Sequence, residues 1–170
     1  MDESTNLYYP PKLWYNAQDP LVFLAGPIKG AEDWQSQAIE ILHKSNPQLN
    51  IANPRRQNFE EDGVQVLWET NHLRLASAYG GILFWLAKEV EHIPERAFGQ
   101  TTRFELGEWF THYKYRKIHQ PDKKIKIALG IDDEFPGRDY VIERVFEDCP
   151  EFIIATTLEE TCQLMTDMLK

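Results

Sequence analysis

Residues 99–109, with the sequence GQTTRFELGEW, hold the acidic side chain that is best placed to do chemistry. The pattern predicts a helix that Thr101 or Thr102 caps and that reaches about His119. Glu105 then lies in the first turn or so of that helix, where the positive end of the helix dipole keeps a carboxylate ionised, as a nucleophile requires. From spacing alone, a favourable interaction of the carboxylate with the helix dipole explains the position of Glu105 better than a catalytic role does.

A glycine-containing loop follows the first apolar run of the chain. Its residues Gly26, Pro27 and Ile28 precede a predicted helix. A glycine directly after a buried strand lets the backbone approach a ligand, and a helix N-terminus favours anions. The glycine spacing fits neither a Walker loop nor a Rossmann fingerprint, so a tight turn explains the loop as well as a phosphate or ribose cradle does.

Two adjacent arginines, Arg55 and Arg56, follow the second apolar run. They suit a phosphate or carboxylate that is held through bidentate hydrogen bonds. The alternative is a solvated pair that is bonded to the nearby acids Glu60 and Glu61. The two interpretations carry about equal weight.

A third pattern, Glu-x-x-His, places Glu69 and His72 on one predicted helix. Di-iron proteins use this spacing, but they need the motif twice, together with carboxylates from two further helices. The chain has one copy in an α/β pattern. We therefore expect neither a metal nor another cofactor.

Five short apolar runs alternate with helical patterns, and these elements must position the candidate residues. The predicted strands are residues 21–25, 49–52, 82–86, 125–129 and 152–155. Helices are predicted from an N-cap at Asp33 to Asn46, then at about 62–78, up to about 119, and at 138–147 and 158–169. On the helix at 62–78, the side chains expected to face the sheet are Val64, Leu67, Trp68, Leu75 and Ala76.

This alternation predicts an α/β fold, because parallel strands need crossover connections. We expect a five-stranded parallel sheet of order 2-1-3-4-5 in a flavodoxin/Rossmann-like three-layer sandwich. Ligands bind such sheets beyond the carboxyl ends of the strands, at the switch point between strands 1 and 3. That rule selects the loops after Ala25 and Leu86 and, secondarily, the loop after Ala52.

The composition narrows the range of partners. The 170 residues include 18 Lys and Arg against 27 Asp and Glu, a formal net charge of −9. Duplex nucleic acid is bound by clustered cations, so this balance argues against it and leaves only a small basic pocket open. The sequence shows no bilayer-spanning run and no signal-peptide pattern. We expect a cytoplasmic protein that does not bind membranes.

The first twenty residues differ in kind from the rest. They mix the aromatic residues Tyr8, Tyr9, Trp14 and Tyr15 with prolines, which disfavours helix. We expect an N-terminal aromatic and proline arm over residues 1–20, lying as a strap across the chain's own surface, and a single domain over 21–170. An arm that crosses to a neighbouring subunit is the less favoured alternative.

Five short motifs together resemble the nucleoside 2-deoxyribosyltransferase superfamily, in particular its branch of short deoxyribosyltransferase-like proteins. In chain order they are FLAGPIKG at 23–30, NPRR at 53–56, WETNHL at 68–73, ILFW at 82–85 and TTRFELGEW at 101–109. Each motif is short, but the five follow the family order across roughly residues 20 to 130. The resemblance implies the same five-stranded parallel sheet.

The resemblance also implies roles for individual residues. The glutamate of the family's Glu-Leu-Gly element is the catalytic nucleophile, and it falls on Glu105. The loop after the first strand lines the nucleoside pocket, which corresponds to residues 26–28. Thr101 and Thr102 occupy the neighbourhood that holds the sugar or a 5′-phosphate.

This chain departs from the family pattern around the leaving base. The well-characterised transferases carry aspartates before the nucleophile and on the helix preceding the third strand, where this chain offers Gly99, Thr102 and either Glu69 or His72. Glu69 and His72 are therefore both candidates for the group that assists the departing base. Further substrate-binding candidates are Arg55, Arg56, Arg103 and the base-stacking residue Trp85. Trp34 and Trp68 are also candidates to stack on a base, although core packing is the better explanation for each of the three tryptophans.

The expected function is cleavage of the N-glycosidic bond of a nucleoside or nucleotide through a covalent glycosyl-Glu105 intermediate, with transfer of (deoxy)ribose to another base or to water. Arg55 and Arg56, if they face the pocket, favour a phosphorylated substrate and hydrolysis. The alternatives are a nucleotide-binding or sensing module with the same pocket and no turnover, and a structural subunit joined through its arm. The resemblance implies a small-molecule nucleoside or nucleotide as ligand and a homo-oligomer, dimeric or higher.

Overall fold

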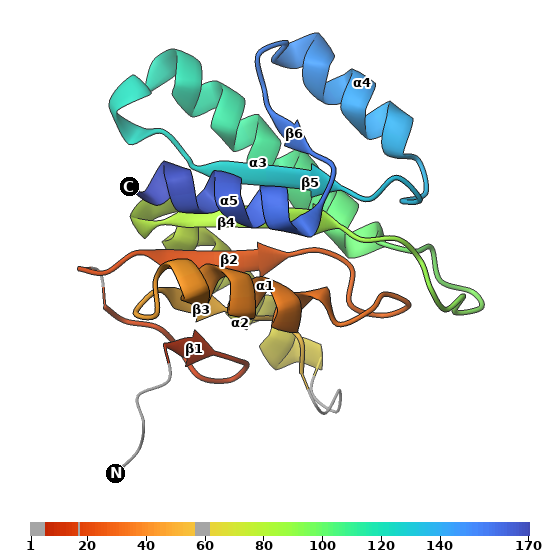
Figure 1. The fold of residues 1–170 in the computed structure, drawn as a ribbon, viewed down its shortest axis with the longest axis horizontal. Coiled ribbons are helices and arrows are strands. Elements are labelled where there is room, and N and C mark those ends of the chain that lie inside the picture. The colour runs from red at the N-terminus through yellow and green to blue at the C-terminus, as the bar shows by residue number, and fades with distance from the viewer. Residues whose placement is uncertain (1–5, 17, 57–61) are drawn as a thin grey trace.

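The computed structural model describes residues 6–16, 18–56 and 62–170. Six strands form one parallel sheet in the order β1-β3-β2-β4-β5-β6 (Figure 1). They are β1 Leu7–Tyr8, β2 Leu21–Ala25, β3 Asn50–Ala52, β4 Gly81–Leu86, β5 Ile127–Ile131 and β6 Ile154–Ala155. The five predicted strands and their order are confirmed, and the structure adds β1 at the edge beside β3.

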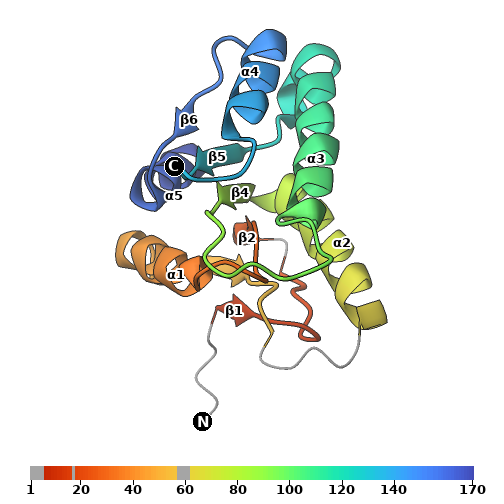
Figure 2. The same ribbon diagram turned by 90° about the vertical axis from the view of Figure 1, so that its right-hand side faces the viewer.

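Five helices cover the two faces of the sheet, with α1 and α5 on one face and α2, α3 and α4 on the other (Figure 2). They are α1 Trp34–Ser45, α2 Asp62–Tyr79, α3 Gln100–His119, α4 Arg138–Asp148 and α5 Leu158–Leu169, with a short 3-10 turn η1 at Pro121–Lys123. A hydrophobic core lies on each face of the sheet, and alternate residues of β2 point into one or the other. Phe23 packs on Trp68 of α2, whereas Val22 lies in the core under α1. The predicted three-layer α/β sandwich is confirmed.

Most predicted boundaries hold within two residues. Asp33 caps α1 as expected, because its side chain accepts a hydrogen bond from Ser36 N–H (3.2 Å). β5 starts two residues later than predicted, at Ile127, because the buried Ile125 fills the core before the strand joins the sheet. Within the described residues, no helix is long and apolar enough to span a membrane.

The predicted inner face of α2 is correct only in its later turns. Trp68 and Ala76 are buried, whereas Val64 is 41% and Leu67 73% exposed. The first turns of α2 lie farther from the strands than its later turns do (Figure 2). Val66 in this part lines a cavity instead.

The N-terminal arm packs against its own chain. β1 pairs with β3, with Leu7 opposite Ile51. Farther along the arm, the Trp14 side chain is 1% exposed, and the indole Nε1–H of Trp68 donates to Lys12 O (2.7 Å). These contacts tie the arm to both the sheet edge and α2, as expected of a strap.

The contact between His72 and the arm predicts a loss of stability in mild acid. His72 Nδ1–H donates to Trp68 O (2.8 Å), and its Nε2 accepts from Trp14 N–H (3.2 Å), so the neutral ring uses both nitrogens. Burial lowers the pKa of His72. As the pH falls below about 6.5, the unfolded chain takes up a proton that the folded chain resists, so the free energy of unfolding decreases by at most about 1.4 kcal/mol per pH unit until the folded pKa is reached.

Urea unfolding between about pH 5 and pH 8 measures this effect. The effect of His72 is given by the difference between the wild-type protein and His72→Gln in how the free energy of unfolding changes with pH. The comparison is needed because carboxylates also change this free energy with pH. The exposed His119 provides the matched control, and His119→Gln is expected to keep the wild-type pH dependence. The same pH dependence in the wild type and in His72→Gln would contradict the role of His72.

Candidate active site

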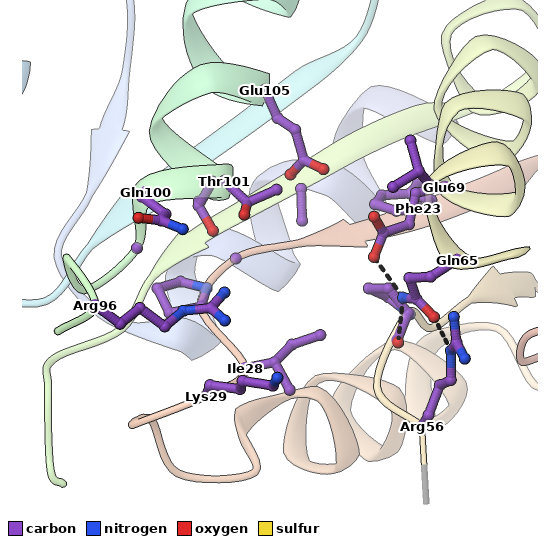
Figure 3. Close-up of a pocket in the computed structure, with 17 residues that line it drawn as sticks. Phe23, Ile28, Lys29, Arg56, Gln65, Glu69, Arg96, Gln100, Thr101 and Glu105 are labelled. Carbon is purple, nitrogen blue, oxygen red and sulfur yellow. Dashed lines mark hydrogen bonds between the residues drawn. The ribbon is translucent and has the colours of Figure 1, made fainter. Parts of the chain in front are cut away.

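A cavity of about 310 Å³ opens at the carboxyl edge of the sheet. It is lined by residues from the loops after β2, β3 and β4 and from the first turns of α2 and α3 (Figure 3). These are the three loops selected by the switch-point rule. Among the predicted site residues, the lining includes Gly26, Pro27, Ile28, Arg56, Glu69, Thr101, Thr102 and Glu105.

The loop after β2 owes its shape to close contacts beneath it. A Cβ at Gly26 would lie 2.3 Å from Trp85 O and 2.5 Å from the ring of Trp34, so a larger residue would force the loop to move. The Trp34 Nε1–H donates to Pro27 O (2.8 Å). Trp34 therefore supports the cavity wall from the core rather than stacking on a ligand.

The start of α3 differs from the prediction. Its N-cap is Gly99, with φ at 64°, and no side chain caps the helix. The predicted cap by Thr101 or Thr102 is wrong, because the left-handed turn at Gly99 begins the helix earlier and leaves both threonines in the lining of the cavity. Glu105 consequently lies in the second turn of α3, farther from the helix N-terminus than expected.

Glu105 points into the cavity across from Glu69 of α2 (Figure 3). Burial raises the pKa of Glu105 to about 8, and the negative charges of Glu69 and Glu108 contribute to the rise. The expectation that the helix dipole keeps this carboxylate ionised is wrong for the free protein. Desolvation and two neighbouring acids outweigh the dipole, whose effect fades beyond the first turn.

Glu69 is held by a chain of hydrogen bonds that runs to Arg56. Arg56 Nε–H donates to Gln65 Oε1, and Gln65 Nε2–H donates both to Glu69 Oε1 and to Pro54 O (Figure 3). Burial raises the pKa of Glu69, while the hydrogen bond from Gln65 and the charge of Arg56 pull it down. The cavity therefore brings together two carboxylates that both hold protons more tightly than usual.

Two other predicted residues next to this chain take structural positions. Arg55 turns away from the cavity lining and bonds to Gln35 Oε1 (2.9 Å) and Glu32 O (2.8 Å), with Asp33 at 3.2 Å. His72 is fully buried against the arm, one helical turn from Glu69. Glu60 and Glu61, the alternative partners of the arginines, lie outside the described residues.

Trp85 and Arg103 also lie outside the cavity lining. Trp85 points to the opposite face of the sheet, in the core under α1 and α5. The guanidinium of Arg103 stacks on Phe135 at 4.6 Å and donates to Pro136 O. Trp68 is buried at 2% exposure, so none of the three candidate tryptophans lines the cavity.

Four polar residues of the lining are absent from the predicted site residues: Lys29 of the loop after β2, Gln65, Arg96 and Gln100. The sequence does carry a signal for each of them. Gln65 stands four residues before Glu69, the spacing at which helical side chains meet. Arg96 lies in the loop after β4 that the switch-point rule selects, and Gln100 begins the helix that carries Glu105.

Comparison with known proteins gives one family. None of the curated proteins matches the chain at a significant level. The family model described as nucleoside 2-deoxyribosyltransferase like matches residues 19–120. This stretch runs from the start of β2 to the end of α3 and contains every residue that lines the cavity. The chain therefore belongs to the nucleoside 2-deoxyribosyltransferase-like family.

Proposed function

We propose that this protein cleaves the N-glycosidic bond of a nucleoside or nucleotide, with Glu105 as the nucleophile. The observation that carries the proposal is the pair of carboxylates, Glu105 and Glu69, that come from separate helices and face one cavity (Figure 3). Membership of the family supplies the class of bond. Retaining cleavage of a glycosidic bond needs two such groups, one that attacks carbon and one that handles the leaving group.

In the first step, a carboxylate oxygen of Glu105 attacks C1′ of the sugar. The bond from C1′ to the base nitrogen breaks as the new ester bond forms, and the base leaves with the bonding electron pair. Glu69 donates a proton to the departing base. Both carboxyl groups have raised pKa values, and two close acids share protons as a coupled pair. The reactive form carries the proton on Glu69 and the charge on Glu105.

In the second step, water or an acceptor base attacks C1′ of the glycosyl ester. The bond from C1′ to the Glu105 oxygen breaks, which restores the carboxylate, and Glu69 takes the proton that the attacking group releases. Water gives hydrolysis and a base gives transfer. Two displacements at C1′ retain the configuration of the sugar.

Chromatography of base release tests this proposal. The protein is incubated with nucleosides and with their 5′-monophosphates, with and without an acceptor base. We expect a free base from at least one of them, and an exchanged nucleoside if the acceptor competes with water. Thermal stabilisation by a ligand, without base release from any compound, would favour a binding module. The raised pKa of Glu105 is compatible with that alternative, because a protonated carboxyl is a poor nucleophile.

The pH dependence of turnover follows from the protonation of the nucleophile. The reactive form has one proton on Glu69 and none on Glu105, so the pair must carry a single proton. The pKa of Glu105 is raised to about 8, and kcat/KM is therefore expected to fall above that pH, by about tenfold per pH unit, as the pair loses its last proton. Initial rates at low substrate concentration measure this falling limb, since kcat/KM reports the free enzyme. A kcat/KM that stays constant up to about pH 10 would exclude a reactive form with the proton on Glu69.

A further inference from the structure

The side-chain amide of Gln65 lies between Arg56 and Glu69, and its neighbours fix its orientation (Figure 3). The Nε–H of Arg56 can only donate, so it requires the amide oxygen Oε1. The carbonyl oxygen of Pro54 can only accept, and it receives a hydrogen bond of 2.9 Å from the amide Nε2–H. A flipped amide would place N–H against N–H and oxygen against oxygen. The amide therefore presents an N–H group to Glu69.

This N–H group decides which oxygen of Glu69 carries a proton. It donates to Oε1 of Glu69, and an oxygen that accepts in this direction cannot carry a proton that points back at the donor. When Glu69 is neutral, its proton consequently lies on Oε2. A donor that is aimed at a carboxyl oxygen also favours the ionised carboxylate over the neutral acid.

The other surroundings of Glu69 oppose its ionisation. Burial raises the pKa of Glu69, whereas the hydrogen bond from Gln65 and the charge of Arg56 lower it. The second acid, Glu105, faces it across the cavity (Figure 3). Among the described residues, the remaining charged side chains of the lining are Lys29, from the loop after β2, and Arg96, from the loop after β4. Arg56 is the cation that the described hydrogen bonds connect to Glu69.

The proposed reaction needs the two carboxyls to carry one proton between them. Two neighbouring buried acids keep both protons to a higher pH than exposed acids do, because burial and mutual repulsion both oppose ionisation. With both protons in place, Glu105 has no charge and cannot attack C1′. A chain of donors that ends on one of the acids lowers the pH at which the first proton leaves. It thereby widens the pH range in which the pair holds a single proton.

We propose that Gln65, oriented by Arg56, is a positioning residue for Glu69, which places the acid proton on Oε2 and allows the pair to release its first proton in spite of burial. This inference rests on the proposed function, because it takes Glu69 as the acid. As the proton passes from Oε2 to the leaving base, the carboxylate that forms keeps its hydrogen bond from Gln65. Arg56 then acts through Gln65 rather than on the substrate.

A Gln65→Met variant tests the inference without any turnover, because it removes the amide and keeps a side chain of similar length. ¹³C NMR of protein labelled at the glutamate δ carbon follows the ionisation of Glu69, and Glu69→Gln identifies its signal. We expect Glu69 to titrate about one pH unit higher in Gln65→Met than in the wild type, as for loss of one hydrogen bond to a charged group.

Gln163→Met provides the matched control. Gln163 also donates to an acid four residues later on its helix, Asp167 (3.0 Å), but it is exposed on α5 and lies outside the cavity lining. This variant is expected to leave the titration of Glu69 unchanged. Gln65→Glu is a second test variant, since its carboxylate still accepts from Arg56 but cannot donate to Glu69, and it should also raise the pH at which Glu69 titrates. Thermal unfolding of all three variants checks that the fold is intact.

The acid side of the kcat/KM profile reports the same step during turnover. Below its maximum, kcat/KM falls as the pair takes up its second proton. This limb is expected to move to higher pH in Gln65→Met and to stay in place in Gln163→Met.

The NMR titration decides the inference whether or not the protein releases a base. If Glu69 titrates at the same pH in Gln65→Met as in the wild type, the positioning role is overturned, and base release by the wild type would still support the proposed function. If Glu69 titrates at higher pH in Gln65→Met but no compound loses its base to the wild type, the effect of Gln65 on Glu69 stands and the proposed reaction fails.

Discussion

Replacing Glu105 by glutamine is expected to lower base release by about 10³-fold or more and, at the same time, to make the protein more stable at neutral pH. The loss of activity follows from chemistry, because an amide cannot form the glycosyl ester that a carboxylate forms. The gain in stability follows from burial. Burial and the charges of Glu69 and Glu108 raise the pKa of this carboxyl to about 8, so its ionised form opposes folding.

The sign of the stability change depends on pH. The folded pKa of Glu105 lies above the ordinary value of 4.5, so the unfolded chain releases this proton first as the pH rises. The wild type therefore loses stability between about pH 4.5 and pH 8, and Glu105→Gln does not share that loss. Urea unfolding at one pH within this window and one below it measures the change in stability. The chromatographic assay on the same preparation measures the loss of base release.

Glu108→Gln provides a matched control on the same helix. Glu108 is exposed and lies outside the cavity lining, so this variant is expected to retain base release. Its lost charge lowers the pKa of Glu105 and moves the falling limb of kcat/KM to slightly lower pH. Base release that survives in Glu105→Gln would contradict the role of Glu105. An equal stability gain in both variants would show that the effect is not due to the buried carboxyl.

Replacing Glu69 by glutamine is expected to have two opposite effects. Loss of the proton donor lowers kcat by about 10²-fold or more, as for other general acids. Loss of its negative charge also lowers the pKa of Glu105, because Glu69 is the larger of the two charges that raise it. In this variant Glu105 titrates alone, so the plateau of kcat/KM should be lower and kcat/KM should no longer fall above about pH 8, a combination that a merely unfolded or weakened variant would not produce.

The pH profile of kcat/KM for Glu69→Gln measures both effects together. Glu69→Asp, which keeps the carboxyl on a shorter side chain, is expected to recover part of the plateau. Glu40→Gln, at an exposed residue of α1 outside the cavity lining, should match the wild type. A substrate whose base is a good leaving group should lose less in Glu69→Gln. An equal loss of kcat/KM for all bases, with the fall at high pH still present, would rule out acid assistance by Glu69.

Much of the framework that carries these residues is predictable from local sequence. Apolar runs such as 21–25 have side chains that must be buried on both sides, which is the condition of a strand inside a parallel sheet. Their alternation with helical patterns leaves few topologies, and the observed order of the five predicted strands is the expected one. The same rule selects the three loops that line the cavity.

Orientation within an element was less predictable. Glu69 and His72 stand three residues apart on α2, yet Glu69 lines the cavity while His72 bonds to the arm. Arg55 and Arg56 are adjacent, yet Arg55 supports the N-terminus of α1 and Arg56 lines the cavity. Spacing shows that two residues share a region, but the partner that each meets comes from a distant part of the chain.

The sequence by itself determined five of the six strands, their order and the edge of the sheet at which the cavity opens, because these follow from the period of burial and from the handedness of crossovers. Only the tertiary structure decided the state of Glu105. Its pKa depends on how much water the surrounding loops exclude and on the approach of Glu69 from another helix. Desolvation and charge coupling are properties of the assembled cavity, so no pattern within residues 99–109 contains them.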